Sequence, residues 1–283
     1  MSGFPEREAR EIVTRALAED IGPGGDITTA ATASPGAAVR AVVVARERMV
    51  ACGLPLARIV MDQLAPSAGG RVAVALRAAE GEPVAAGHAL AVLEGPALAV
   101  LAGERVLLNL LGRLCGVATL TAQAVAEVAG TGCRISDTRK TTPGLRALEK
   151  HAVRAGGGES HRPTLDSMVL VKDNHKLLAG GLAEAIARLS RAGHDLPQVE
   201  VEVETLDEVN VALASGVGWI LLDNMRLADI REAVRRCAGQ ARLEVSGGLR
   251  PGTLRPYAEA GVQRLSLGCL THGARSMDVA LDL

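Results

Sequence analysis

Basic residues that can bind a small anion are concentrated in one part of the chain. All lysines lie between residues 140 and 176, although arginine is the common basic residue elsewhere. The basic candidates in this part are Arg139, Lys140, Arg146, His161, Arg162 and Lys172. Guanidinium and ammonium groups form charge-assisted hydrogen bonds with carboxylates and phosphates. The set predicts a site for a small ligand with several negative charges. The alternative is that chance and ordinary solvated positions explain the cluster of lysines, with Lys150 and Lys176 simply exposed.

Acidic residues follow in the next part of the chain. In the run VEVEVE at 199–204, Glu200, Glu202 and Glu204 alternate with valine, so their carboxylates share one face of a strand. Glu202 and Asp223 would lie on neighbouring strands, where they could bind sugar hydroxyls, Mg²⁺ or positive charge that develops on a sugar ring. Exposed acids on a solvated edge strand are the alternative, which the apolar residues of the run disfavour.

Small residues suited to a phosphate follow two later apolar runs. Ser246, Gly247 and Gly248 end one run, and Gly268 ends the next. Without bulky side chains in the way, backbone N–H groups approach an anion closely, particularly beside a helix N-terminus. These positions predict a phosphate site, and ordinary turns between strand and helix are the alternative.

The pattern beyond residue 133 supplies a scaffold that can bring these separate runs together. Strand-like runs alternate there with helical patterns, as in βα units around a parallel sheet. The predicted strands are 133–137, 168–173, 199–204, 219–224, 242–248 and 264–268. The predicted helices are 145–155, 182–192, 206–214, 227–237 and 252–259. These strands are too few for a complete barrel of about eight, and their carboxyl ends should face one mouth, where reactive groups gather.

The first half of the chain has a different pattern. Apolar residues at helical spacing predict a helix over 6–20, which the run GPGGD ends. Short Val and Ala runs separated by Gly and Pro turns over 39–93 predict a small, sheet-rich α+β domain. A further helix is predicted over 104–128. The two halves of the chain therefore differ in architecture.

The composition excludes several classes of protein. The 283 residues include 31 Lys and Arg and 32 Asp and Glu, so the net charge of −1 gives no overall positive field to bind nucleic acid. The apolar stretch at 114–126 is too short to span a bilayer. Glu6 and Arg7 interrupt the segment that a signal peptide needs, and the scattered cysteines suggest buried thiols rather than a disulfide framework. We expect a cytoplasmic protein that binds neither nucleic acid nor membrane.

Several segments together carry a family resemblance. DTRKTTPGLRALEKHAVRAGGG at 137–158 contains the very specific motif DTRKTTPGLR. The other segments are EDIGPGGDITT (19–29), GERVLLNLLGRLCGVAT (103–119), SHR (160–162), VLVKDNH (169–175), VEVEVETLDE (199–208), ILLDNM (220–225), LEVSGGL (243–249) and LSLGCLTH (265–272). The chain resembles the quinolinate phosphoribosyltransferases, also called carboxylating nicotinate-nucleotide pyrophosphorylases.

This resemblance implies a fold and an assembly. It implies an N-terminal α+β sandwich domain over 1–110, followed by an incomplete, about six-stranded parallel α/β barrel over 111–270. We expect the tail at 271–283 to pack on the first domain. The resemblance also implies a homodimer in which Arg105 of one subunit reaches the other subunit's site.

The resemblance implies a reaction and a role for each candidate residue. The pyridine nitrogen of quinolinate attacks phosphoribosyl pyrophosphate, and CO₂ is lost to give nicotinate mononucleotide and pyrophosphate. The residues that match the family's binding residues for the quinolinate carboxylates are Arg105, Arg139, Lys140, His161, Arg162 and Lys172. Glu202 and Asp223 match the family's acids that bind the ribose hydroxyls and Mg²⁺, and with Lys140 they are the predicted catalytic residues. The family's 5-phosphate site is matched by Ser246, Gly247, Gly248 and Gly268.

One loop departs from the family pattern, and one related family is the alternative. Ser160 stands where Asn is usual, and Pro163 and Thr164 follow the His-Arg pair. Pro163 favours an extended backbone at Arg162. A ModD-like or other non-catalytic relative that binds a phosphorylated ligand is the alternative, although the TRKTTPG run favours the transferase. The acceptor stays open among quinolinate, nicotinate and other pyridine acids.

Overall fold

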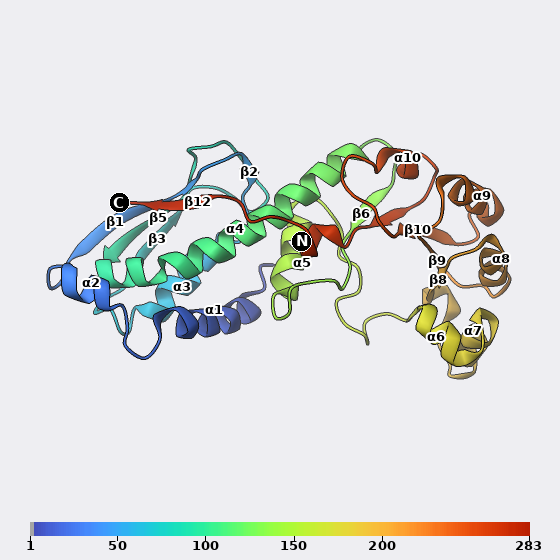
Figure 1. The fold of residues 1–283 in the computed structure, drawn as a ribbon, viewed down its shortest axis with the longest axis horizontal. Helices are drawn as coiled ribbons and strands as arrows, with labels where there is room; N and C mark the ends of the chain where they lie inside the picture. The colour runs from blue at the N-terminus through green and yellow to red at the C-terminus, as the bar shows by residue number, and fades with distance from the viewer. Residues whose placement is uncertain (1–2) are drawn as a thin grey trace. The chain divides into compact units, whose positions relative to one another are not determined.

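The computed structural model describes residues 3–283, which form two compact units (Figure 1). Unit 1 comprises the residues up to Ala122, Thr141–Gly157 and Thr271–Leu283. Unit 2 comprises Gln123–Lys140 and Gly158–Leu270. Whereas the sequence suggests successive domains with a boundary near residue 110, the chain contributes to unit 1 in three separate segments.

Unit 1 is built around an antiparallel sheet. Its strands are β1 (Ala38–Ala45), β2 (Met49–Val50), β3 (Ala73–Leu76), β4 (Pro83–Val84), β5 (Ala89–Pro96) and β12 (Val279–Asp282). The main sheet has the order β12-β1-β5-β3, and β2 pairs separately with β4. Val42 of β1 pairs with Asp282 of β12, so the C-terminal segment forms an edge of this sheet.

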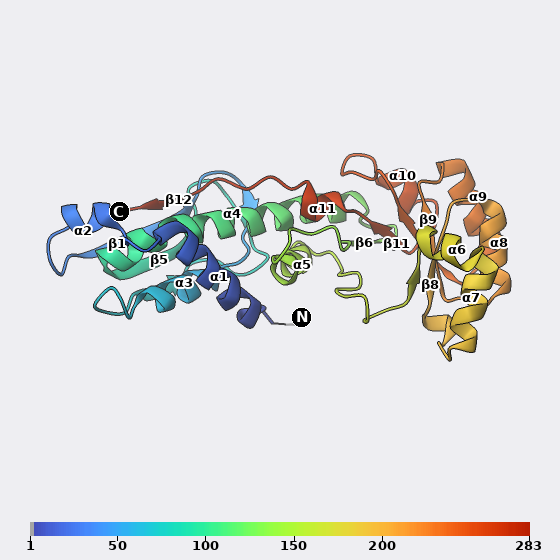
Figure 2. The ribbon, with the colours of Figure 1, turned by 60° about the horizontal axis from the view of Figure 1, so that its bottom comes forward.

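The helices of unit 1 are labelled in Figures 1 and 2. They are α1 (Glu6–Ile21), α2 (Ile27–Thr32), α3 (Leu56–Leu64), α5 (Arg146–Ala155) and the long α4 (Ala97–Glu127), whose last residues belong to unit 2. In α1, Ala9, Val13 and Leu17 recur every four residues and are buried, as the sequence predicts. Both views show α4 running along the four-stranded sheet.

Two helical features of unit 1 differ from the prediction. The sequence gives no helix over 56–64, because α3 lies within a segment dominated by Val and Ala runs. The helix predicted at 104–128 begins earlier, at Ala97, because Gly103 is accommodated within the helix and does not interrupt it. A Cβ at Gly103 would lie 2.8 Å from Leu64 Cδ1, so this glycine allows close packing of α4 against α3.

Unit 2 contains a parallel sheet. Its strands are β6 (Arg134–Ser136), β7 (Leu170–Val171), β8 (Glu200–Val203), β9 (Trp219–Asp223), β10 (Arg242–Ser246) and β11 (Arg264–Ser266). The six strands have the order β6-β11-β10-β9-β8-β7, and all their pairings are parallel. The first two strands in sequence are thus the two edges, which confirms an incomplete barrel: the chain between them departs to form α5 in unit 1.

Helices follow the parallel strands from β7 onward. They are α6 (Asp173–Ala179), α7 (Leu182–Arg191), the 3₁₀ helix η1 (Leu196–Gln198), α8 (Leu206–Ala214), α9 (Leu227–Cys237), α10 (Arg255–Ala258) and α11 (Cys269–His272). The helix α6 is not among the predicted helices, because its first residue, Asp173, ends an apolar run and is predicted to belong to a strand. Of the predicted 252–259 helix, only α10 forms. Among residues 3–283, no helix has both the length and the apolar character needed to cross a membrane.

Candidate active site

The parallel sheet of unit 2 gathers candidate residues at one edge. Lys172 directly follows β7, Glu202 lies near the end of β8, Asp223 ends β9 and Ser246 ends β10. Because the strands are parallel, their carboxyl ends open on the same side of the sheet. The residues predicted from separate runs therefore share one mouth.

Glu202 lies inside the barrel and is paired with a lysine. The strand β8 is hydrogen-bonded on both sides, to β7 and β9, so the exposed edge strand considered from the sequence is wrong. Glu200 and Glu202 point to the same face and are both buried. Lys172 Nζ donates to Glu202 Oε2 at 2.5 Å. The ion pair holds one basic and one acidic candidate together at the mouth.

The other charged residues at the mouth affect the pKa of Asp223. Partial burial raises this pKa above its ordinary value, and the negative charge of Glu202 adds to the effect. The Asn224 amide, which donates to Asp223 Oδ2 at 2.7 Å, and the positive charges of Lys172 and Lys140 act in the opposite direction. The charges of Glu202, Lys172 and Lys140 thus all act on Asp223 at the mouth.

Arg162 and Arg139 form a cationic pair. Arg162 is buried, and its Nη1 donates to the Met168 carbonyl at 3.1 Å. Burial, and next the positive charge of Arg139, lower the pKa of Arg162. An anion bound near Arg162 would offset this effect of the positive charge of Arg139. This pair is suited to the carboxylates of a ligand.

His161 faces the barrel interior rather than solvent. Its Nε2 lies 3.1 Å from Glu200 Oε2 and 3.5 Å from Glu244 Oε1, and its backbone N–H donates to Asp137 Oδ1 at 2.8 Å. Burial would lower the pKa of His161, but hydrogen bonds to Glu200 and Glu244 outweigh it and raise the pKa to about 9. The Arg162 N–H, 2.8 Å from Nδ1, instead favours the neutral ring. In either state Nε2 carries a hydrogen and donates it to the carboxylates, while ligand binding by His161 stays a prediction.

A second cation completes this buried network. Arg264 Nη1 contacts Glu244 Oε2 at 2.8 Å, and its guanidinium carbon lies 4.0 Å from the centroid of the Trp219 ring. Glu244 therefore bridges His161 and Arg264 inside the barrel. Glu244 and Arg264 are not among the site residues predicted from the sequence, although a carboxylate within the apolar run LEV indicates a paired buried charge.

Glu244→Gln should lower the free energy of unfolding by about 1–3 kcal/mol, because the neutral amide leaves Arg264 and His161 short of negative charge in a buried place. Denaturant unfolding followed by circular dichroism measures the change. Glu184→Gln is the matched control, since Glu184 makes only exposed pairs with Arg188 and Arg191. Equal stability of the two variants would contradict a structural role for the network.

The glycines after β10 shape a tight turn. Gly247 has a φ of 99° and Gly248 a φ of 62°, a region that favours glycine. A Cβ at Gly247 would lie 2.2 Å from Asn224 Oδ1 and 2.8 Å from Asn224 N. The predicted helix does not follow this turn directly, since α10 begins only at Arg255. Any phosphate held here thus depends on backbone N–H groups of the turn rather than on the dipole of that helix.

Two basic candidates belong to unit 1 instead. Arg105 lies on α4, and its exposed side chain is 3.9 Å from Glu104. Arg146 begins α5, and its Nε donates to Thr141 Oγ1 at 3.0 Å. All other predicted site residues belong to unit 2.

Comparison with known proteins identifies similar chains over the whole length. The family models "Quinolinate phosphoribosyl transferase, N-terminal domain" and "C-terminal domain" match residues 26–115 and 117–282. The nicotinate-nucleotide pyrophosphorylase [carboxylating] of Mycobacterium leprae is 41% identical over 278 residues, covering 97% of each chain. A probable enzyme of the same name from Synechocystis is 40% identical over 273 residues, covering 94% of this chain and 90% of the relative.

A solved structure agrees with the sequence comparison. The nicotinate-nucleotide pyrophosphorylase from Ehrlichia chaffeensis superposes with a TM-score of 0.91 at 36% identity, covering 100% of this chain and 99% of that one. The similarity includes both units, and it gives no support to the ModD-like alternative.

Proposed function

Because the chain belongs to the quinolinate phosphoribosyltransferase family, we propose that the strand-end residues of unit 2 carry out the family's reaction. The enzyme transfers a phosphoribosyl group to quinolinate with decarboxylation, a step of NAD biosynthesis. One observation carries the assignment of the site: Lys172 donates to Glu202 at the mouth, and the charges of Glu202, Lys172 and Lys140 all act on Asp223. Quinolinate, a dicarboxylate, requires basic residues, which form the basic half of the site. The sugar requires acidic residues, which form its acidic half.

The basic half positions the acceptor. Arg139 and Arg162 would hold quinolinate carboxylates, so that the pyridine nitrogen faces the anomeric carbon of phosphoribosyl pyrophosphate. When the bond to pyrophosphate breaks, positive charge develops on the ribose ring, and Glu202 and Asp223 would stabilise it. Loss of CO₂ then leaves negative charge on the pyridine ring, which the ammonium group of Lys140 would stabilise. No covalent intermediate with the enzyme is required.

Glu202 and Asp223 also fit a divalent cation. Their carboxylates are oxygen ligands of the kind Mg²⁺ prefers, and a cation would offset the negative charge of Glu202 that raises the pKa of Asp223. When bound, Mg²⁺ would neutralise the leaving pyrophosphate. Ser246, Gly247, Gly248 and Gly268 would receive the 5-phosphate of the same substrate, supported by the open backbone of their turns.

The assembly we propose is a homodimer in which the partner supplies Arg105. Within residues 3–283 its ionic neighbour on α4 is Glu104, at 3.9 Å, and its side chain is exposed, so it is accessible to a second subunit. We also infer a cytoplasmic location, because the cysteines of the described chain are free thiols, as in reducing compartments.

Mixing two inactive variants tests the shared site. Arg105→Ala and Lys140→Ala should each lose activity, whereas a dissociated and reassociated mixture should recover about a quarter of wild-type activity, since only mixed dimers contain one intact site. Size-exclusion chromatography confirms that both variants are dimers. A mixture that stays inactive although dimers exchange would show that Arg105 serves its own subunit or none.

The reaction itself is tested by supplying quinolinate, phosphoribosyl pyrophosphate and Mg²⁺ and measuring released CO₂ together with nicotinate mononucleotide. Both products should form in equal amounts. Nicotinate supplied instead of quinolinate should react far more slowly, because it lacks the second carboxylate that the basic half would bind. Comparable rates with the two acceptors would overturn the assignment of Arg139 and Arg162.

A further inference from the structure

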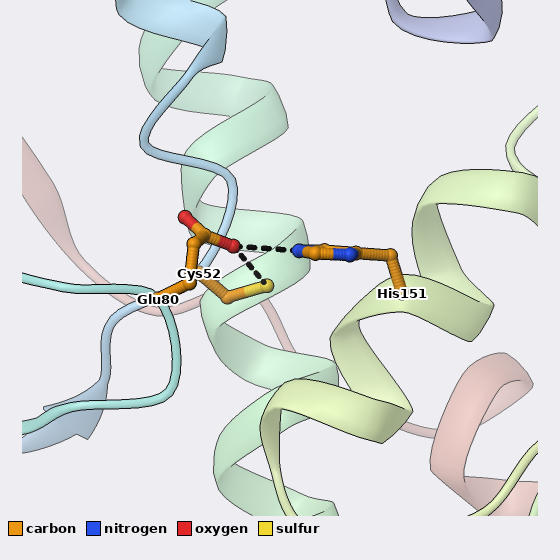
Figure 3. A group of neighbouring side chains, drawn as sticks. All are labelled: Cys52, Glu80 and His151. Atoms are coloured by element: carbon orange, nitrogen blue, oxygen red, sulfur yellow. Dashed lines mark hydrogen bonds and ion pairs between the residues drawn. The ribbon is translucent and has the colours of Figure 1, made fainter. Parts of the chain in front are cut away.

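A sulfur, an imidazole nitrogen and a carboxylate oxygen converge in unit 1, apart from the residues of the proposed reaction (Figure 3). Cys52 follows β2, Glu80 lies in the loop between β3 and β4, and His151 lies on α5. Glu80 Oε2 is 2.7 Å from His151 Nε2 and 3.5 Å from Cys52 Sγ. All three ligand atoms lie within 4.8 Å of one another.

These separations suit a small metal ion. Zinc binds sulfur at about 2.3 Å and nitrogen or oxygen at about 2.0–2.2 Å in tetrahedral geometry, which puts neighbouring ligand atoms roughly 3.2–3.8 Å apart. The three atoms need only small side-chain movements to reach such distances. We propose that Cys52, Glu80 and His151 bind one Zn²⁺ ion, with water as the fourth ligand.

The surroundings hold two of these ligands in place. Glu80 Oε1 accepts the Leu54 N–H at 2.7 Å and Oε2 accepts the Gly53 N–H at 3.1 Å, so the carboxylate is fixed to the loop that carries Cys52. The Phe4 ring contacts the His151 ring edge to face, with centroids 5.1 Å apart. The Glu80 side chain is 27% exposed, which leaves a path for an ion to enter.

The protonation states also permit the site. Among the described residues His151 Nδ1 has no hydrogen-bond partner, so no neighbour prevents the tautomer that frees Nε2 for a metal. Zinc binds cysteine as the thiolate, so the proton of Cys52 would leave when the ion binds. A thiolate and a carboxylate then balance the charge of Zn²⁺ in this buried place.

The ligand set distinguishes this cation from the one proposed for the reaction. A thiolate and an imidazole favour Zn²⁺ or Co²⁺, whereas Mg²⁺ prefers oxygen ligands only. The bound ion would link the loop at 52–54, the loop at 79–82 and α5. It would stabilise unit 1 through residues that are not among those proposed for the reaction.

Metal counting on the intact protein tests the proposal. Metal-free protein dialysed against Zn²⁺ in the presence of excess Mg²⁺ should retain one Zn²⁺ per chain, and Co²⁺ should give the near-ultraviolet charge-transfer band of a cobalt–thiolate bond. Cys52→Ser should abolish the band. His151→Gln should weaken Zn²⁺ binding at least about tenfold.

Cys133→Ser is the matched control, because it replaces a buried thiol in unit 2 and should retain both the metal and the band. Failure of wild-type protein to hold Zn²⁺, or a cobalt–thiolate band that persists in Cys52→Ser, would overturn the proposal. Circular dichroism identifies variants that fail to fold, and the wild-type measurement decides even then. The test does not measure transferase activity, so its failure would leave the proposed function unaffected.

Discussion

Lys140→Ala should lower turnover by about 10²–10³-fold, as expected when one group that stabilises developing charge is removed. The charge of Lys140 acts on Asp223 at the mouth of unit 2, and its side chain is exposed. Truncating an exposed side chain changes stability by at most about 0.5 kcal/mol, so the loss should be confined to catalysis. Steady-state CO₂ release and denaturant unfolding measure the two effects separately.

Two further variants serve as controls for Lys140→Ala. Lys140→Arg preserves the charge and should recover part of the turnover, although guanidinium and ammonium groups differ in geometry. Arg235→Ala removes an exposed cation from α9 and should leave turnover unchanged. Near wild-type turnover in Lys140→Ala would show that Lys140 does not act in the reaction.

Gly247→Ala should lower kcat/KM for phosphoribosyl pyrophosphate by about 10²-fold, because misplacing a binding group by about 1 Å has effects of this size. The added Cβ would collide with both the side chain and the backbone N of Asn224. That backbone N donates to the Ser246 carbonyl at 3.0 Å, so it cannot move away without opening the turn. Steady-state kinetics at saturating quinolinate isolate the effect.

Gly252→Ala separates collision from backbone strain. Gly252 also has a positive φ, 95°, but a Cβ there meets nothing within 4 Å. This control should lose about 1 kcal/mol of stability and keep its kcat/KM. If both alanine variants had the same kcat/KM, the turn at Gly247 would not shape the phosphate site.

The alternation of strands and helices in unit 2 was predictable from the sequence. Each of the six strands overlaps its predicted range. A buried parallel strand is a short apolar run in the sequence, and this local signal does not depend on which strands become its neighbours. The run at 168–173 was the least accurate: only Leu170–Val171 is strand, and Asp173 already begins α6. Local pattern locates an element better than it locates its ends.

The division into units was not predictable in the same way. Residues 141–157 follow the β6 strand in sequence, yet they belong to unit 1 with α5. Nothing in the amphipathic pattern of α5 states which core its apolar face will join. A Cβ at Gly156 would lie 2.4 Å from the Ala118 carbonyl oxygen. The packing of α5 in unit 1 therefore depends on a close contact between segments that are far apart in the chain.

The sequence by itself determined which residues end the strands of unit 2, and therefore which charges reach the mouth, because strand periodicity and parallel connection are local properties. Only the tertiary structure decided which charges are buried together. Glu244 pairs with His161 and Arg264, and Glu80 with His151, across 20 to more than 70 residues. Burial makes an unpaired charge costly, so such partners are selected by the packed core rather than by spacing along the chain.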